Sequence, residues 1–175
     1  KPLVFFLPLM KHSSTFSEVN GKGEKIMDAQ EKFEELPVMP VHPLPTWSSL
    51  EIRGTVGKHL DLFLNDLLLM PQSTFTADFE CNAGWISPAQ EWEGVPVKHI
   101  LGQAEVALST QKVEFHSGEY CQILTIEEAL DSTVMIALRL NGKPLPVGNG
   151  GPCRLIAGGR KGPAHVKWLQ AMNVT

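Results

Sequence analysis

The 175-residue sequence has few of the features that mark specialised classes of protein. Its three cysteines are an odd number at wide spacing, without the density of a disulfide scaffold or the CxxC pairs of a zinc site. Its longest apolar run, residues 3–10, is interrupted by Pro8 and is too short to span a bilayer. We therefore expect reduced thiols and no membrane span. No signal peptide is visible, so we expect a cytoplasmic protein; a periplasmic one stays open if the chain is a processed precursor.

Acidic residues are absent from residues 132–175, although the chain has nineteen of them and a net charge of -4. Six of its fifteen basic residues lie in that segment: Arg139, Lys143, Arg154, Arg160, Lys161 and Lys167. They are spread among glycines, without interleaved aromatics or a basic helix face, which disfavours nucleic acid as a partner. A compact ligand that carries a phosphate suits this segment better.

The hydrophobic content of 43% and the length suit one globular domain with a sizeable core. Period-two and apolar patterns predict strands at residues 50–56, 60–63, 73–81, 112–116, 120–124, 134–140 and 171–174. Short helices are predicted at residues 25–36, 67–69, 97–104, 125–130 and 164–170, and a loop rich in Pro, Gly and Trp after Trp85. Without regular βα alternation, the class is α+β, mixed and β-rich. We expect an irregular arm at residues 1–45 and one domain at residues 46–175.

The segment from Ser73 to Trp85 ends its strand on a thiol. Phe75 and Phe79 fall on the inward side of the alternation, and Cys81 is the last inward residue before a turn-forming sequence. A rigid strand that stops at an irregular loop fixes a side chain and leaves room for a ligand. Cysteine is also among the most buried residue types, so an inert core thiol is the alternative.

The segment from Gly142 to Gly162 contains seven glycines and cannot form a helix. It can form a loop whose backbone amides approach a ligand closely, with Arg154, Arg160 and Lys161 supplying positive charge. Both the glycines and the charge indicate an anion site.

These segments together resemble the molybdopterin-dependent oxidoreductases of the sulfite oxidase type, including their small single-domain prokaryotic members. The resemblance runs from about Trp47 to Val174 and is carried by LEIRGTVG, LDLFLNDLLLMP, FEC and WEGVPVKHIL, then by NGKPLP, GGPCRL and VKW. Residues 1 to about 40 are not covered. The resemblance implies the fold of that family's molybdopterin-binding domain and the molybdenum cofactor (molybdopterin).

The resemblance also implies roles for single residues. Cys81 would be the protein ligand of molybdenum, a metal that accepts soft thiolate donors. Contacts to the cofactor would come from His42, Asn149, Gly150, Arg154, His165 and Lys167. Tyr120 aligns with a family position near the cofactor, although a tyrosine packed at a strand edge is the alternative.

Other residues leave alternatives open. A lone histidine such as His42 is more often a satisfied structural residue than a ligand, and His165 can cap the basic end without touching a ligand. Trp85 and Trp92 either wall a substrate funnel or belong to the core. Cys121 and Cys153 carry no pairing signal, and we expect both to be buried small hydrophobes.

The sequence departs from the sulfite-oxidising members near the proposed metal. Those members place arginines just before the histidine and shortly after the cysteine, where this chain reads MPVH and CNAGWISP. Sulfite is therefore not supported as the substrate. Haem-binding and dimerisation segments are also absent from the sequence, so electrons are expected to pass to a separate partner.

Three functions follow as hypotheses. The first is an oxidoreductase that transfers an oxygen atom or electrons on a small-molecule substrate at molybdenum, with Cys81 as ligand. The second is a non-catalytic molybdopterin-binding or carrier module of the same fold. The third is a β-rich interaction domain without a cofactor. Because a carrier needs the phosphate site but not the metal thiolate, Cys81 favours the first.

Overall fold

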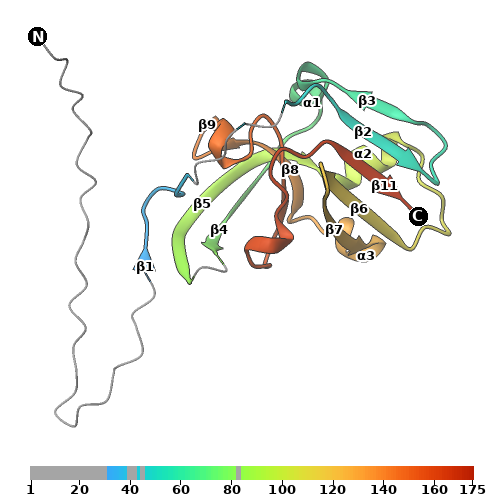
Figure 1. Cartoon of the computed structure of the whole chain (residues 1–175). Helices are drawn as coiled ribbons and strands as arrows, with labels where there is room; N and C mark the ends of the chain where they lie inside the picture. Colours follow the sequence, from blue (N-terminus) through green and yellow to red (C-terminus); the bar gives the residue numbers. More distant parts are fainter. Residues whose placement is uncertain (1–30, 39–42, 44–45, 82–83) are drawn as a thin grey trace, which may run out of the picture. The chain divides into compact units, whose positions relative to one another are not determined.

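The computed structural model describes residues 31–175, which form one compact unit, except residues 39–42, 44–45 and 82–83. Two β-sheets make up this unit (Figure 1), and a few short helices join and cover them. The predicted class, α+β and β-rich, is confirmed. None of the helices in the described part of the chain has the length and apolar character of a membrane span.

The first sheet has six strands and carries the strand that leads to Cys81. Its main path runs β1-β5-β8-β10, with β4 on β5 and β9 on β8. The strands are β1 (Glu31–Lys32), β4 (Ser73–Glu80), β5 (Trp85–Pro96), β8 (Val134–Leu140), β9 (Lys143–Pro144) and β10 (Arg154–Ala157). The predicted strands at 73–81 and 134–140 are thereby confirmed.

The second sheet has five strands in the order β3-β2-β11-β6-β7. They are β2 (Leu50–Gly54), β3 (Leu60–Leu62), β6 (Lys112–Ser117), β7 (Tyr120–Thr125) and β11 (Ala171–Val174). The C-terminal strand β11 lies parallel to β2 and antiparallel to β6, so it joins the two halves of the sheet. All five strands were predicted from the apolar pattern.

The helices are short, and local hydrogen bonds fix where they start. They are α1 (Leu64–Leu69), α2 (Val97–Gln103), α3 (Ile126–Ala129) and two 3-10 turns, η1 (Val147–Asn149) and η2 (Gly162–Ala164). At α3 a capping box fixes the start: the Thr125 hydroxyl accepts from the amide of Glu128, and the Glu128 carboxylate accepts from the amide of Thr125.

Two groups of buried apolar side chains form the core. The larger lies between the sheets and includes Leu50, Phe115 and the inward face of α2. The smaller group surrounds Phe79 and Trp92 on the six-stranded sheet. Leu36, in the segment before the proline-rich stretch, is buried in this second group. Residues 33–38, which we expected to belong to an arm, therefore contact the domain.

The sequence prediction was wrong after Trp85, where the expected loop is the twelve-residue strand β5. Its proline and glycine occupy the positions where a strand tolerates them. Pro88 precedes Ala89, which has a φ of 49° beside a register shift between β4 and β5. A Cβ on Gly94 would lie 2.0 Å from the carbonyl oxygen of Ile136, so this glycine permits close pairing with β8.

Two predicted helices are also absent in the described residues. The first predicted helix covered residues 25–36, of which residues 25–30 lie outside the described residues. The described part contains the strand β1 instead, because its backbone groups pair with β5. Residues 165–170 form only a bend and a turn, because the amide of Leu169 donates to Cys153 and the amides of His165 and Val166 pair with Gly162 and Leu155. The one helical turn there, η2, comes earlier.

Candidate functional site

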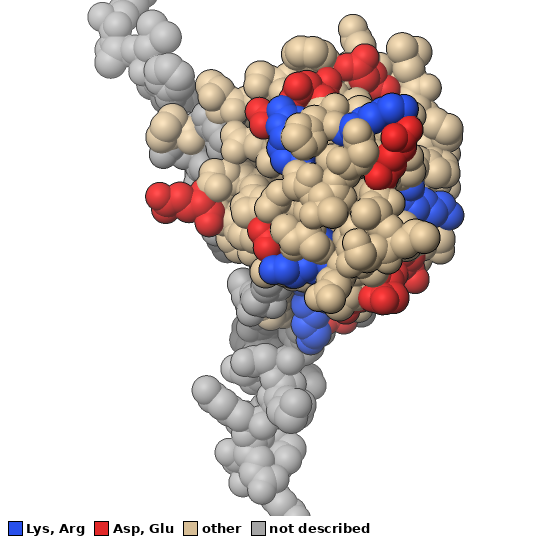
Figure 2. All heavy atoms as spheres, turned by 90° about the vertical axis from the view of Figure 1, so that its right-hand side faces the viewer, with Lys and Arg blue, Asp and Glu red and all other residues tan. Residues whose placement is uncertain are grey.

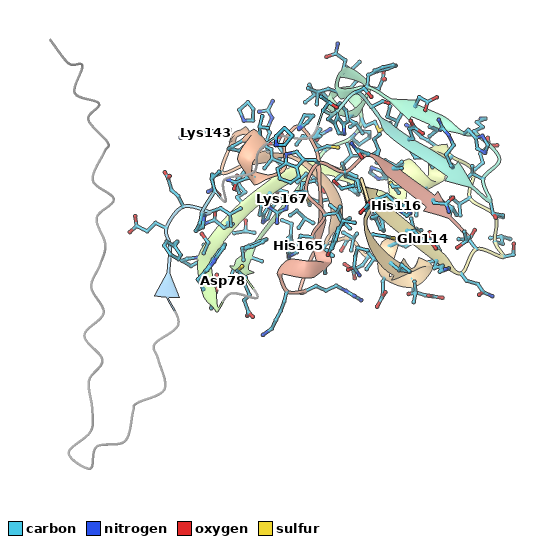
Figure 3. The ribbon with its side chains drawn as sticks, viewed as in Figure 1. Asp78, Glu114, His116, Lys143, His165 and Lys167 are labelled. Carbon is cyan, nitrogen blue, oxygen red and sulfur yellow. The ribbon has the colours of Figure 1, made fainter. Side chains whose placement is uncertain are left out.

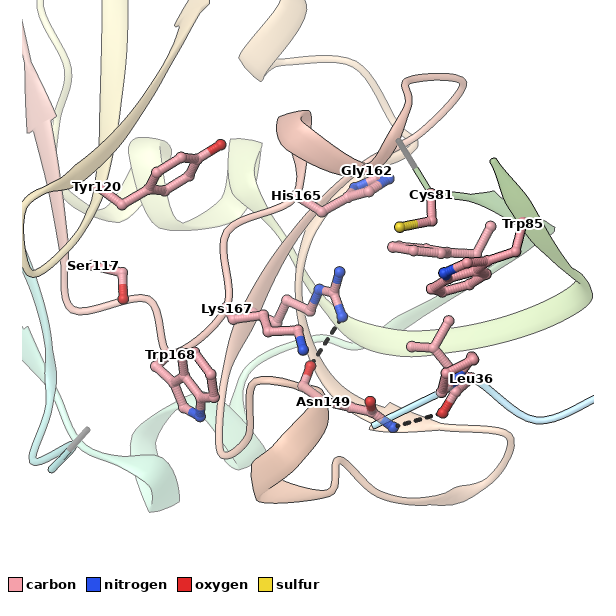
Figure 4. A pocket seen from close by; sticks show the side chains of 13 residues that line it. Leu36, Cys81, Trp85, Ser117, Tyr120, Asn149, Gly162, His165, Lys167 and Trp168 are labelled. Atoms are coloured by element: carbon pink, nitrogen blue, oxygen red, sulfur yellow. Dashed lines mark hydrogen bonds between the residues drawn. The ribbon is translucent and has the colours of Figure 1, made fainter. Parts of the chain in front are cut away.

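A cavity of about 470 Å³ opens where the two sheets meet the glycine-rich segment (Figure 4). It draws side chains from both sheets, from η1 and η2, and from the segment before residue 39. The lining residues are Leu36, Pro37, Phe79, Cys81, Trp85, Ser117, Tyr120, Asn149, Arg154, Gly162, His165, Lys167 and Trp168. The cavity therefore unites the thiol of Cys81 with the basic segment.

Cys81 sits directly after β4, as the alternation predicts. Its amide donates to the carbonyl of Trp85 at 3.0 Å, and its carbonyl accepts from the amide of Gly84 at 3.0 Å. The side chain is half-buried and free, and Figure 4 shows its sulfur directed into the cavity beside Trp85. The turn that follows β4 thus holds the backbone of Cys81 while its thiol stays available.

Arg154 opens β10 and is 3% exposed. Its guanidinium carbon lies 4.9 Å from the ring centre of Phe79 and 5.4 Å from that of Trp92, and Nη1 donates to the carbonyl of Asn149 at 3.0 Å. Burial lowers the pKa of Arg154 to about 10, and the nearby Cys81 opposes that shift. Arg154 is a buried cation, and none of the ion pairs in the described part of the chain includes it.

Lys167 is a second cation on the same cavity. Its Nζ donates to the carbonyl of Gly148 at 2.9 Å and lies 5.5 Å from the ring centre of Trp168. Burial first, and then the charge of Arg154, lower the pKa of Lys167 to about 8. Two partly dehydrated cations that repel each other stabilise a bound anion, because an anion removes the repulsion and replaces lost water.

The glycine-rich segment brings its backbone to these cations. Gly150 has a φ of 101°, and a Cβ there would lie 2.8 Å from the Cβ of Lys167. Two buried polar atoms beside this turn, Oδ1 of Asn149 and Nε of Arg154, have no hydrogen-bond partner among the described residues. Native proteins rarely leave such atoms unpaired, so they are available to a ligand.

Ion pairs fasten the loop that carries Gly162. Arg160 pairs with Glu128 of α3, and Nζ of Lys161 lies 3.1 Å from a carboxylate oxygen of Glu80 at the end of β4. These two cations are therefore neutralised by acidic partners that lie outside the cavity lining. The sequence grouped them with Arg154, but the structure separates the paired cations from the unpaired ones.

His165 lines the cavity with both ring nitrogens already engaged. Nδ1 accepts from the amide of Ala157 at 3.1 Å, and Nε2 lies 3.1 Å from the carbonyl of Arg160. Burial, and then the charge of Arg154, lower the pKa of His165 to about 3. The imidazole is thus neutral, and it offers a ligand its ring, which lies 5.0 Å from that of Phe79, rather than a nitrogen.

The opposite wall comes from the tip of the β6–β7 hairpin. Ser117 and Tyr120 are paired across it, and Tyr120 is 45% exposed. Trp168 lies on the same side, with its indole nitrogen donating to the carbonyl of Val147 at 2.8 Å. This wall presents aromatic surface and hydroxyl groups to the cavity.

The structure therefore unites six of the predicted site residues at one place: Cys81, Tyr120, Asn149, Arg154, His165 and Lys167 line the cavity, and Gly150 adjoins Lys167. The predicted His42 lies outside the described residues. Trp85 lines the cavity as one alternative had it, whereas Trp92 is 2% exposed and belongs to the core.

The two cysteines outside the cavity differ in exposure, and some cavity residues were not predicted. Cys153 is buried, as expected, but Cys121 is exposed, because it faces away from the core on β7. Sequence reasoning missed Leu36, Ser117 and Trp168 as cavity residues. The only available signal was the position of Trp168 directly after Lys167, and nothing local distinguishes Leu36 or Ser117.

Comparison with known proteins gives this fold and cavity a family. Residues 36–175 match the model of the family described as "Oxidoreductase molybdopterin binding domain". The chain belongs to that family. The cofactor bound by this domain is accordingly molybdopterin, and the unpaired cations and unpartnered polar atoms of the cavity fit its phosphate and polar ring system.

The chain matches relatives with named activities, but only over part of the length of each relative. The chain is 29% identical to the protein-methionine-sulfoxide reductase catalytic subunit MsrP of Gluconobacter oxydans, over 76% of this chain and 48% of the relative. It is 28% identical to mitochondrial sulfite oxidase of Rattus norvegicus, over 79% of this chain and 31% of the relative. The chain thus spans less than half the length of these relatives.

A solved structure agrees with the fold. The sulfane dehydrogenase SoxCD from Paracoccus pantotrophus is similar with a TM-score of 0.67 and 27% sequence identity, over 73% of this chain and 38% of that chain. The family and the β-rich fold that the sequence motifs implied are therefore confirmed.

Proposed function

We propose that this domain is the catalytic domain of a molybdopterin oxidoreductase that removes an oxygen atom from a small neutral donor, such as a sulfoxide or an N-oxide. When bound, the cofactor supplies a molybdenum centre that accepts oxygen and stores electrons. The observation that carries the proposal is one cavity that holds a free thiol and two cations with no acidic partner in the described part of the chain.

The residues divide between holding the cofactor and holding the metal. Arg154 and Lys167 would neutralise the phosphate, with Nε of Arg154 and Oδ1 of Asn149 as further hydrogen-bonding atoms. The thiol of Cys81, at the end of a rigid strand, would supply the protein ligand to molybdenum, losing its proton as a bound thiol does. The neutral His165 would support the cavity wall without donating a nitrogen.

The preference for a neutral substrate rests on where the cations lie. An oxyanion held beside the metal needs fixed cations to replace its water. Among the described lining residues Arg154 and Lys167 are the cations, and both are assigned to the cofactor. Arg53 is held elsewhere, because it donates to the carbonyls of Ile52 and Leu60 and pairs with Asp61.

The remaining wall suits a neutral donor. Trp85, Tyr120 and Trp168 offer aromatic surface, and Ser117 offers a hydroxyl group. Reduction of a sulfoxide to a sulfide requires two electrons and two protons and releases the oxygen as water. A separate electron-transfer partner would supply the electrons. The named activity of the Gluconobacter relative, a methionine-sulfoxide reductase, supports this substrate class.

The test is a steady-state comparison with the molybdenum-loaded protein and an artificial electron carrier. We expect reduction of sulfoxides or N-oxides and little or no oxidation of sulfite. A kcat/KM for sulfite above about 10⁵ M⁻¹s⁻¹, which is within the normal range of evolved enzymes, would overturn the proposal. Loaded protein that turns over none of these substrates, yet transfers its pterin to an apo-acceptor, would favour a carrier.

A further inference from the structure

We propose that Glu114, His116 and Cys121 form a second metal site, for a divalent ion of the zinc type, on the outer face of the five-stranded sheet. This inference is independent of the proposed redox function. It starts from the one cysteine whose position the sequence misjudged, since Cys121 is exposed and lies next to a histidine and a carboxylate.

The strand register places the three side chains on one face. His116 of β6 is directly opposite Cys121 of β7, and Glu114 lies two residues before His116. Their neighbours Val113 and Phe115 point the other way into the core, so the cluster lies on the outer face. Figure 3 shows Glu114 and His116 on this strand, away from Lys167 and His165.

The distances between the donor atoms suit a tetrahedral ion. Bonds of about 2.3 Å to sulfur and about 2.0 Å to nitrogen or oxygen set tetrahedral ligand atoms about 3.3–3.5 Å apart. Here Sγ of Cys121 lies 3.7 Å from Nε2 of His116, which lies 3.4 Å from Oε2 of Glu114. All three atoms lie within 4.8 Å of one another. A small rotation of the exposed thiol would bring Sγ of Cys121 to the tetrahedral distance from Oε2 of Glu114.

Neighbouring groups orient the carboxylate. Nζ of Lys112 donates to Oε1 of Glu114 at 2.9 Å, and Asn173 of β11 is directly opposite Glu114 in the sheet. These contacts leave Oε2 turned toward His116. Because partners of this kind fix the orientation of metal ligands, the site is prepared before an ion arrives.

The hairpin frame is equally fixed. Gly118, at the turn, has a φ of 56°, and its amide donates to the side chain of Gln170 at 2.8 Å. The carbonyl of His116 accepts from the backbone amide of Gln170, also at 2.8 Å. Thiolate, imidazole and carboxylate on such a frame match zinc, with a fourth position left to water or an external ligand. Binding would displace the thiol proton of Cys121 and would involve no redox step.

Charges of both signs lie at the cluster, because Nζ of Lys112 is 2.9 Å from Oε1 of Glu114. In Figure 2, which views the right-hand side of Figure 1, basic and acidic side chains stand side by side. Lys112 is the basic side chain in contact with the cluster. Its replacement therefore provides a matched control, because it removes a charge at the same place without removing a metal donor.

The experiment is a titration of the reduced full-length protein with Co²⁺, followed by competition with Zn²⁺. We expect one ion with a thiolate charge-transfer band and visible bands of tetrahedral cobalt, displaced by zinc, in holo-protein and equally in Cys81→Ser. Cys121→Ser should abolish the thiolate band, and His116→Asn should weaken binding by more than about tenfold, since even outer partners of metal ligands contribute about 10–100-fold.

Further variants exclude a trivial result. Cys121→His keeps a donor, so it should retain cobalt but lose the thiolate band, and Lys112→Gln should bind as tightly as the original or more so. Each variant must show an unchanged thermal midpoint without metal. Failure to bind cobalt, or a thiolate band that survives Cys121→Ser and disappears in Cys81→Ser, would overturn the site.

Discussion

Two cysteine and histidine pairs in this domain have opposite surroundings. Cys81 and His165 line the cavity together with Arg154 and Lys167, two cations without an ion-pair partner among the described residues. Cys121 and His116 lie on the open face of the five-stranded sheet, beside the carboxylate of Glu114. The same two residue types therefore occur once in a positive, partly buried setting and once in an exposed setting with a negative group.

The free atoms differ as well. In the cavity both nitrogens of His165 are engaged by backbone groups, so of this pair the thiol of Cys81 is the group left to ligate. On the sheet face, Nε2 of His116 is directed at both the thiol and the carboxylate. What a site can bind thus depends on which donor atoms remain available and on the charge beside them, more than on residue type.

The largest expected difference between the two cysteine sites is the effect of replacing Cys81. Cys81→Ser should abolish redox turnover, because the metal would lose its proposed protein ligand, while molybdopterin should stay largely bound through the proposed contacts of Arg154 and Lys167. Molybdenum and pterin content, measured beside turnover, checks this. Cys121→Ser is the matched exchange, and its pterin and molybdenum content should equal that of the original protein. Loss of pterin in Cys81→Ser, or full activity, would contradict the assignment.

Removing the charge of Arg154 tests whether the positive setting of the cavity holds the cofactor. Arg154→Met keeps much of the side-chain volume but removes a charge-assisted contact to an anion, worth about 1.5–3 kcal/mol or roughly ten- to a hundredfold in affinity. Lys167→Ala, at a half-buried position, should lower affinity less. Cofactor occupancy under competition with excess apo-protein measures both.

A stability measurement separates this effect from misfolding. Because Arg154 is a buried cation without an ion-pair partner in the described residues, the apo-form of Arg154→Met should be as stable as the original or more so. Thermal midpoints of the apo-proteins test that. A variant that binds the cofactor normally would refute the role of an anion contact, and a destabilised apo-variant would refute the stability prediction.

His165 is expected to affect the pH dependence of stability and not cofactor binding. Its folded pKa of about 3 lies below the ordinary value of about 6.5, so the unfolded chain takes up a proton in this window and the folded protein does not. Stability should therefore fall as the pH drops from about 6.5 toward 3. Between pH 7.5 and pH 5 the loss from this residue is about 2 kcal/mol.

Urea unfolding of the apo-protein at the two pH values, compared with His165→Asn, isolates that contribution. The variant keeps an acceptor for the amide of Ala157 but cannot be protonated. Between pH 7.5 and pH 5, the free energy of unfolding of the variant should fall by about 2 kcal/mol less than that of the original protein. Equal pH dependence in both proteins would show that His165 is not buried in its neutral form.

The amino-acid sequence by itself determined much of the strand pattern and the family. Alternation from Phe75 to Cys81 depends only on which side chains face a core, and the capping box at Thr125 depends on residues three apart. Local patterns of this kind survive without tertiary information. The NGKPLP, GGPCRL and VKW segments likewise identified the family, and the matched residues 36–175 confirm it.

Tertiary contacts decided what local patterns could not. The segment after Trp85 contains the usual signals of a loop, yet pairing with β4 and β8 makes it the longest strand, since Gly94 lets Ile136 approach. Only the folded chain separates Arg160 and Lys161, which pair with acids, from Arg154 and Lys167, which have no acidic partner among the residues that the structure describes. The exposure of Cys121 beside Glu114 and His116 also required the register of β6 on β7, because residues on different strands meet only through long-range hydrogen bonds.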